Sequence, residues 1–107
     1  MSAPETSPLV ATLRAKLAAL PRVTESTSRF GARKRLAWRA GKREIAHLHS
    51  DTTIDIRLPL EERRASAGDE RLLPRASPSD WVECRFASMS DTDFVVDLVA
   101  RAARESR

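Results

Sequence analysis

The stretch from Glu44 to Leu58, EIAHLHSDTTIDIRL, predicts two neighbouring β-strands joined by a tight turn. Apolar and polar residues alternate on both sides of a Ser-Asp pair, and a period of two is typical of strands with one buried face. The same stretch holds both histidines of the chain, His47 and His49. Side chains at that spacing point to one face of a strand, so the histidines are expected to lie side by side.

The alternation divides this strand pair into a core face and an open face. We expect Glu44, Ala46 and Leu48 to share the core face with Ile54 and Ile56, which leaves the histidines outward together with Ile45. By the same alternation, a later segment, WVECRF, turns Val82, Cys84 and Phe86 inward. The open face is then predicted to carry His47, His49, Asp55, Arg57, Trp81, Glu83 and Arg85, with Asp51 at its rim.

The segments on either side of this stretch complete a two-layer domain. RKRLAWR at 33–39 alternates and precedes a turn at Gly41, so three strands form an antiparallel meander. Residues 8–20 carry leucines at helical spacing after a capping Ser7, and residues 90–105 carry a second apolar stripe after a capping Ser90. We predict an α+β fold: a mainly antiparallel sheet of about four to five strands, with helices packed on one face.

Two weaker segments lie between the meander and the last strand. LPLEERRASAGDE predicts a short helix that follows Pro59 and stops at Gly68. RLLPRASPSD, with two prolines and two serines, predicts a loop.

Length and composition indicate one soluble domain. The 107 residues fit a single domain over 8–107, preceded by a flexible tail at 1–7, and 41% of them are hydrophobic. A lone Cys84 excludes an internal disulfide framework and cysteine-based zinc motifs, so a reducing cytoplasm is expected. No apolar run approaches the roughly 20 residues of a membrane span, so no membrane association is predicted.

The histidines and acids support three kinds of chemistry. The first is a polar binding surface for a ligand, a protein partner or a second copy of the chain, centred on His47, His49, Asp51, Asp55, Arg57 and Trp81. The second is a small enzyme with a His–Asp centre, for which Ser50 and Cys84 are poor nucleophiles, being in a turn and in the core. The third is metal binding by His-x-His, but no second histidine or cysteine cluster exists, so no metal and no cofactor is predicted.

Nucleic-acid binding is the alternative to a site on the open face. The run from Arg29 to Arg43, RFGARKRLAWRAGKR, contains no acid, and the chain has a net charge of +4. A basic hairpin can follow phosphates, although Trp38 is expected to face the core and not to stack on bases. The residues predicted to contact phosphate are Arg33, Arg35, Arg39, Lys42 and Arg43.

The motifs of this chain resemble the small bacterial and fungal "luciferase domain" family of unknown function. The resemblance rests on Phe-Gly at 30–31, AHLHSD at 46–51, a proline with a charged helix at 59–68, and Trp-Val at 81–82. Relatives often carry a histidine in the loop before the tryptophan, which this chain lacks, so the resemblance does not imply a three-histidine site. The family name does not predict light emission, because no signature of a flavin or luciferin pocket is present. The order of elements is also distantly similar to MmcQ/YjbR-like domains, which implies possible DNA binding by architecture alone.

Overall fold

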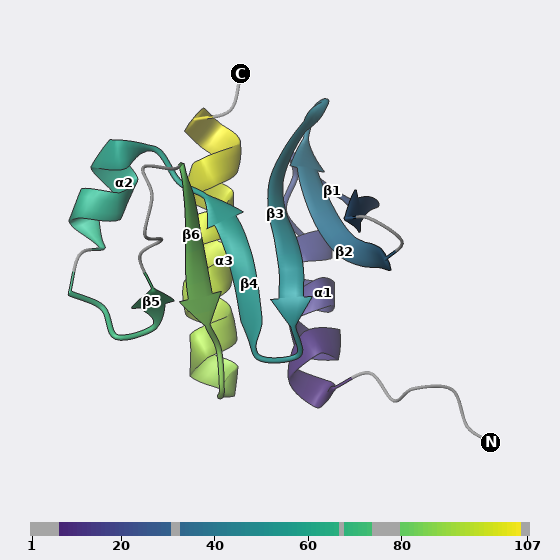
Figure 1. The fold of residues 1–107 in the computed structure, drawn as a ribbon, viewed down its shortest axis with the longest axis horizontal. Coiled ribbons are helices and arrows are strands. Elements are labelled where there is room, and N and C mark those ends of the chain that lie inside the picture. Colours follow the sequence, from purple (N-terminus) through teal and green to yellow (C-terminus); the bar gives the residue numbers. More distant parts are fainter. Residues whose placement is uncertain (1–6, 31–32, 67, 74–79, 106–107) are drawn as a thin grey trace.

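The computed structural model describes residues 7–30, 33–66, 68–73 and 80–105. The elements run in the order α1 (Pro8–Ala18), β1 (Val23–Phe30), β2 (Arg33–Ala40), β3 (Arg43–Ser50), β4 (Thr53–Arg57), α2 (Leu60–Ala65), β5 (Leu72–Leu73), β6 (Trp81–Arg85) and α3 (Met89–Glu105). The six strands form one antiparallel sheet in the order β1-β2-β3-β4-β6-β5. Helices α1 and α3 lie behind this sheet in Figure 1, which confirms the predicted α+β fold.

The sheet has one or two strands more than the sequence predicts. β1, VTESTSRF, has no continuous apolar face, and it joins the sheet by pairing with β2 from Val23↔Ala40 to Phe30↔Arg33. β5 lies within the predicted loop and pairs with β6 through two residues, Leu72 and Leu73. Both strands depend on a stronger neighbouring strand, so their own periodicity does not reveal them.

The core lies between the sheet and the two long helices. Ile54 and Ile56 are fully buried, and the register aligns them with Cys84 and Val82 on β6, as the alternation predicts. Trp38 is also buried, 1% exposed, which confirms its predicted inward direction. The helices contribute the buried residues Val10, Leu13, Leu17, Val95, Leu98, Val99, Ala102 and Ala103.

A β-bulge in β3 corrects the predicted faces of two residues. Trp38 pairs with Ala46, but Arg39 pairs with Glu44, so Ile45 is an extra residue between two ladder pairs. An extra residue interrupts strict alternation and turns the strand. Ile45 is therefore 1% exposed in the core cluster, whereas Glu44 reaches His47 on the other face. The strict alternation placed both of these residues on the wrong face.

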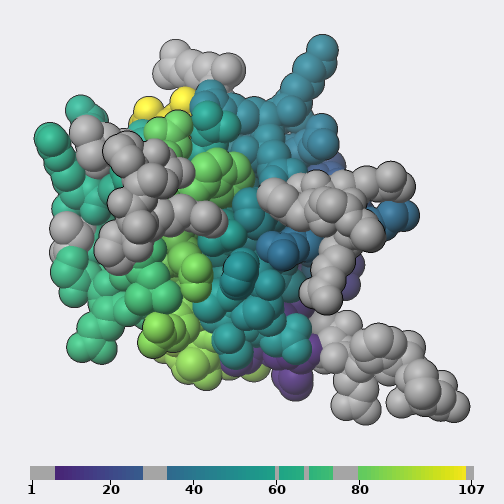
Figure 2. All heavy atoms as spheres, in the orientation of Figure 1, coloured from purple at the N-terminus to yellow at the C-terminus, as the bar shows by residue number. Residues whose placement is uncertain are grey.

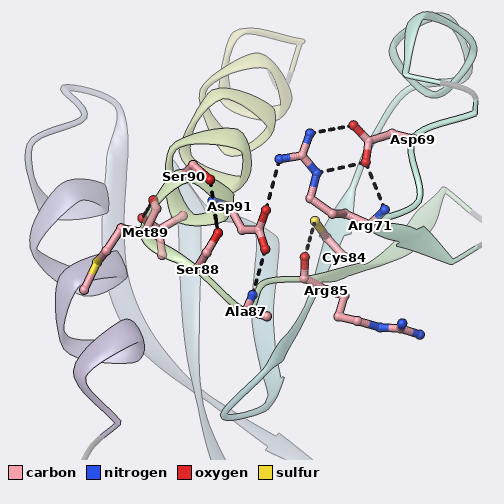
Figure 3. A network of polar contacts seen from close by, with 10 residues as sticks. Asp69, Arg71, Cys84, Arg85, Ala87, Ser88, Met89, Ser90 and Asp91 are labelled. Atoms are coloured by element: carbon pink, nitrogen blue, oxygen red, sulfur yellow. Dashed lines mark hydrogen bonds and ion pairs between the residues drawn. The ribbon is translucent and has the colours of Figure 1, made fainter.

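The N-terminus of α3 is capped two residues earlier than expected. The Ser88 hydroxyl, and not that of Ser90, accepts a hydrogen bond from the Asp91 amide at 3.2 Å. Asp91 Oδ2 in turn accepts from the Ala87 amide at 2.9 Å (Figure 3), one residue before the amide that a capping box would use. The helix consequently begins at Met89.

Arg71 ties the segment before β5 to this helix end. Its guanidinium donates to Asp69 at 2.7 and 2.9 Å and to Asp91 at 3.2 Å, as Figure 3 shows. The same guanidinium carbon lies 3.7 Å from the centroid of the Phe94 ring. A charge-assisted fork of this kind holds both carboxylates in place.

No helix of the described residues is long and apolar enough to cross a bilayer.

Candidate functional site

The open face, the side of the sheet opposite α1 and α3, carries a row of polar side chains across neighbouring strands. The register aligns Ala37 on β2 with His47 on β3, His47 with Asp55 on β4, and Asp55 with Glu83 on β6. Residues paired in this way share one face of a sheet. Figure 2 shows this side of the molecule, where the teal side chains of β3 and β4 adjoin the green ones of β6.

His47 and Asp55 form the centre of this row. His47 Nε2 lies 2.8 Å from Asp55 Oδ2, and His47 Nδ1 lies 3.2 Å from Glu44 Oε2. The register places His47 on the predicted face, but the residue is only 6% exposed and Asp55 only 1%. Ionised carboxylates accept hydrogen bonds and cannot donate them, so His47 satisfies both acids at once when both ring nitrogens carry a proton.

Trp81 packs against this buried histidine. The two ring centroids lie 4.8 Å apart with an interplanar angle of 39°. Trp81 comes from the first position of β6, where it pairs with Arg57. A tryptophan at this position was predicted for the open face, but its contact with His47 was not.

His49 differs from His47 in its surroundings. Its side chain is 48% exposed, and Nδ1 lies 3.8 Å from Asp55 Oδ2, close enough for an ion pair but too far for a hydrogen bond. The pairing shifts between Leu48 and Ser50, so His49 is the extra residue of a second irregularity. The predicted rim residue Asp51 is exposed in the turn between β3 and β4.

Arg57 lies toward the other end of the face. One of its Nη atoms is 3.3 Å from Asp80 Oδ2, and its side chain is 33% exposed. Arg57 and Trp81 are cross-strand neighbours, so the predicted binding residues of β4 and β6 do meet.

Charged side chains differ in depth around the centre of this face. The side chains of Asp55 and Glu44 are 2% and 23% exposed, and the His47 imidazole joins them. The basic side chains that share the face reach further out: His49 is half exposed, and Arg39 and Arg85 are exposed. The most exposed groups around His47 are therefore basic, whereas Glu83 is half-buried beside Asp55 and Asp51 is exposed at the rim.

The predicted nucleic-acid contacts divide between the open face and a turn. Arg35 and Arg39 lie on the same face as Ala37, by the alternation of β2, and Arg39 pairs with Glu44. Lys42 is exposed in the turn between β2 and β3, and Arg43 is the exposed first residue of β3. The side chain of Arg33 lies outside the described residues. Two of the five cations thus share the face of the histidines.

Glu44 is the site residue that the sequence prediction missed. It was assigned to the core face because the two-residue period was taken to continue through EIAH. The signal that could have found it is the consecutive apolar pair Ile45-Ala46, which breaks that period. Two apolar neighbours, both buried, are what a bulge in a strand accommodates.

Cys84 and Ser50, which the sequence predicts to be poor nucleophiles, are a buried thiol and a hydrogen-bonded hydroxyl. Cys84 is fully buried, and burial raises the pKa of its thiol to about 12. A thiol with so high a pKa is not a nucleophile near neutral pH. The Ser50 hydroxyl is hydrogen-bonded to Thr53 Oγ1 at 2.7 Å and supports the turn.

Within the described part of the chain, no three His, Cys, Asp or Glu residues are arranged to hold a metal ion.

The chain matches a known protein family. The family model described as the luciferase domain matches residues 42–102, which is more than half of the chain. The matched region contains His47, His49, Asp55 and Trp81, and it begins at the turn after β2. No curated protein and no solved structure matches. The chain belongs to the luciferase domain family.

Proposed function

We propose that this protein is a small non-enzymatic binding domain that holds an anionic ligand on the open face of its sheet. The observation that supports this most directly is the layering of charge around His47. The buried carboxylate of Asp55 and the half-buried carboxylate of Glu44 are bridged by His47, while exposed basic side chains lie around them. An anion approaching this face meets the basic groups first.

The buried pair also argues for a prepared surface. Removing charged groups from water costs free energy, and a sheet face that only meets solvent has no need of a buried Asp55. The His47 imidazole contacts a carboxylate at each ring nitrogen and packs against Trp81. These contacts fix the position of Trp81 and of the strands around it. Sites of defined geometry need such support from the groups behind them.

Catalysis by the His–Asp pair has less support. A general base needs one ring nitrogen directed at the proton that it removes. Both nitrogens of His47 already contact carboxylates, and Cys84 and Ser50 are engaged elsewhere. The enzyme alternative would require His47 to leave Glu44 before it could act.

Single-stranded nucleic acid is a second candidate ligand. Arg35 and Arg39 share the open face with His49, which joins the two surfaces that the sequence predicts separately. The buried Trp38 supplies no stacking platform, so phosphate contacts would carry the affinity. The single cysteine of the chain is buried, as suits a protein of the reducing cytoplasm. Small anions and nucleic acids are both available in that compartment.

The proposal is tested by titrating ¹⁵N-labelled protein with inorganic triphosphate, a compact polyanion without a base. We expect saturable shifts of the amide signals of His49, Thr53 and Arg85. Replacing His49 and Arg85 together by alanine should weaken binding about tenfold, because two outward hydrogen-bond donors are lost. Arg64→Ala, at an exposed arginine on α2, is the matched control and should bind as well as the wild type.

Two outcomes separate the candidates. Shifts that never saturate, or that map to α1 and α3, contradict a site on the open face. If a deoxythymidine decamer binds far more tightly than triphosphate, and log affinity falls with log salt by about 0.7 per phosphate contacted, the nucleic-acid alternative is favoured.

A further inference from the structure

A small pocket lies at the edge of the sheet where β4 ends and where β3 and β6 begin. Figure 1 shows the C-terminal end of α3 at this same upper edge, behind the strands. The pocket has a volume of about 200 Å³ and is lined by Arg43, Arg57, Pro59, Asp80, Ala102 and Glu105. It is separate from the row of polar residues around His47, and Arg57 is the one residue that it shares with the predicted binding set.

Among the described residues, the lining of this pocket carries equal numbers of opposite charges. Arg43 and Arg57 are balanced by Asp80 and Glu105, so neither a simple anion nor a simple cation matches the whole surface. Pro59 and Ala102 add an apolar part to the wall. A molecule that carries both charges a few bonds apart, with a small apolar group, matches this set.

Arg57 has a hydrogen-bonding donor to spare. Its guanidinium is held by one contact with Asp80, at 3.3 Å, while its Nε is buried without a partner among the described residues. A buried donor without a partner is unfavourable, so a ligand that accepts from it is favoured. When the Arg57 guanidinium turns toward the pocket, its Nε and a neighbouring Nη can both donate hydrogen bonds to one carboxylate of a ligand. This bidentate arrangement is the one that arginine favours.

The part of the lining that α3 contributes suits an ammonium group. Ala102 and Glu105 belong to the last turn of α3, where backbone carbonyls lack partners within the helix. The helix dipole places partial negative charge at that end, and the Glu105 carboxylate adds to it. The helix side of the pocket thus favours a cation, while Arg43 and Arg57 favour an anion beside the Asp80 that Arg57 already contacts.

We propose that this pocket binds a free α-amino acid with a small apolar side chain. The carboxylate contacts Arg57 and Arg43, the ammonium contacts Glu105 at the end of α3, and the side chain lies against Pro59 and Ala102. The pocket volume suits a single amino acid of this size and is below that of pockets for drug-sized ligands, about 300–1,000 Å³. This site is additional to the anion-binding face and does not depend on it.

The test compares L-valine with its two blocked forms by calorimetric titration of the full chain. L-Valine should bind saturably in the millimolar range. N-acetyl-L-valine, which lacks the ammonium, and L-valinamide, which lacks the carboxylate, should each bind about tenfold more weakly. If either blocked form binds as tightly as valine, or if valine does not bind at millimolar concentrations, the proposal is wrong.

Variants assign the binding to this pocket and separate it from the open face. Arg43→Ala and Glu105→Gln each change an exposed lining side chain and should weaken valine binding about tenfold. The control Arg64→Ala should leave it unchanged. The same two pocket variants should bind triphosphate normally, because neither residue lies in the row around His47. Valine binding that is unaffected by both variants would overturn the assignment.

Discussion

His47 Nε2 lies 2.8 Å from Asp55 Oδ2, and both side chains are buried on the sheet face that α1 and α3 do not cover. Glu44 reaches the other ring nitrogen of His47 only because a bulge turns it toward that face. His49, two positions along, is half exposed and makes one longer contact with the same carboxylate. The two histidines of the His-x-His pair therefore differ: His47 is buried between two carboxylates, and His49 is half exposed to solvent.

This difference predicts unequal effects on stability. His47→Ala should lower the free energy of unfolding by about 3 kcal/mol, because it removes the buried partner of the Asp55 carboxylate. Urea denaturation near neutral pH measures the change. From the sequence alone, both histidines would count as surface residues whose loss costs little.

His49→Ala is the matched control for this prediction. The loss of an exposed side chain with one long contact should lower the free energy of unfolding by no more than about 0.5 kcal/mol. Equal losses for the two variants would contradict the assignment of His47 as the supporting residue.

The bulge in β3 predicts that Ile45 behaves as a core residue. Ile45→Ala should cost about 2–4 kcal/mol, as expected for a buried isoleucine, and should match Ile56→Ala on the neighbouring strand. Chemical denaturation measures both changes. Thr53→Ala, on the open face, is the control and should cost under about 1 kcal/mol. If Ile45→Ala changes the free energy of unfolding as little as Thr53→Ala does, Ile45 lies on the open face, where strict alternation places it.

The sequence predicts the regular parts of this molecule well. Ile54, Ile56, Val82 and Cys84 face the core because β4 and β6 alternate without interruption. The prediction fails where local pattern and pairing disagree: β1 has no apolar period, and the bulge at Ile45 reverses the local faces. The burial of His47 was beyond prediction because it depends on Trp81, which a separate part of the chain brings against its ring.

Cys84 should be unreactive in the folded protein. Burial raises the pKa of its thiol to about 12, so almost none is thiolate at pH 8. We expect no reaction with a disulfide reagent until urea unfolds the chain, after which one thiol reacts per molecule. Because the pKa is higher in the folded state, this group's contribution to stability should be lost as pH rises from about 9 to 12. Rapid labelling of the native protein at pH 8 would contradict the burial.

The Arg71 fork predicts a pH dependence at the acid end. Hydrogen bonds from Arg71 lower the pKa of Asp69 to about 2, below the value near 4 that the carboxyl has in an unfolded chain. The unfolded state therefore takes up the proton first as pH falls, so the stabilisation is present above about pH 4 and is lost toward pH 2. Asp69→Asn should be less stable than the wild type near pH 6, with the difference closing between pH 4 and pH 2 in urea midpoints. Asp51→Asn, which removes an exposed turn carboxylate, controls for the loss of one negative charge. A difference between wild type and Asp69→Asn that stays constant across this range would show that the fork stabilises the segment without coupling to the Asp69 proton.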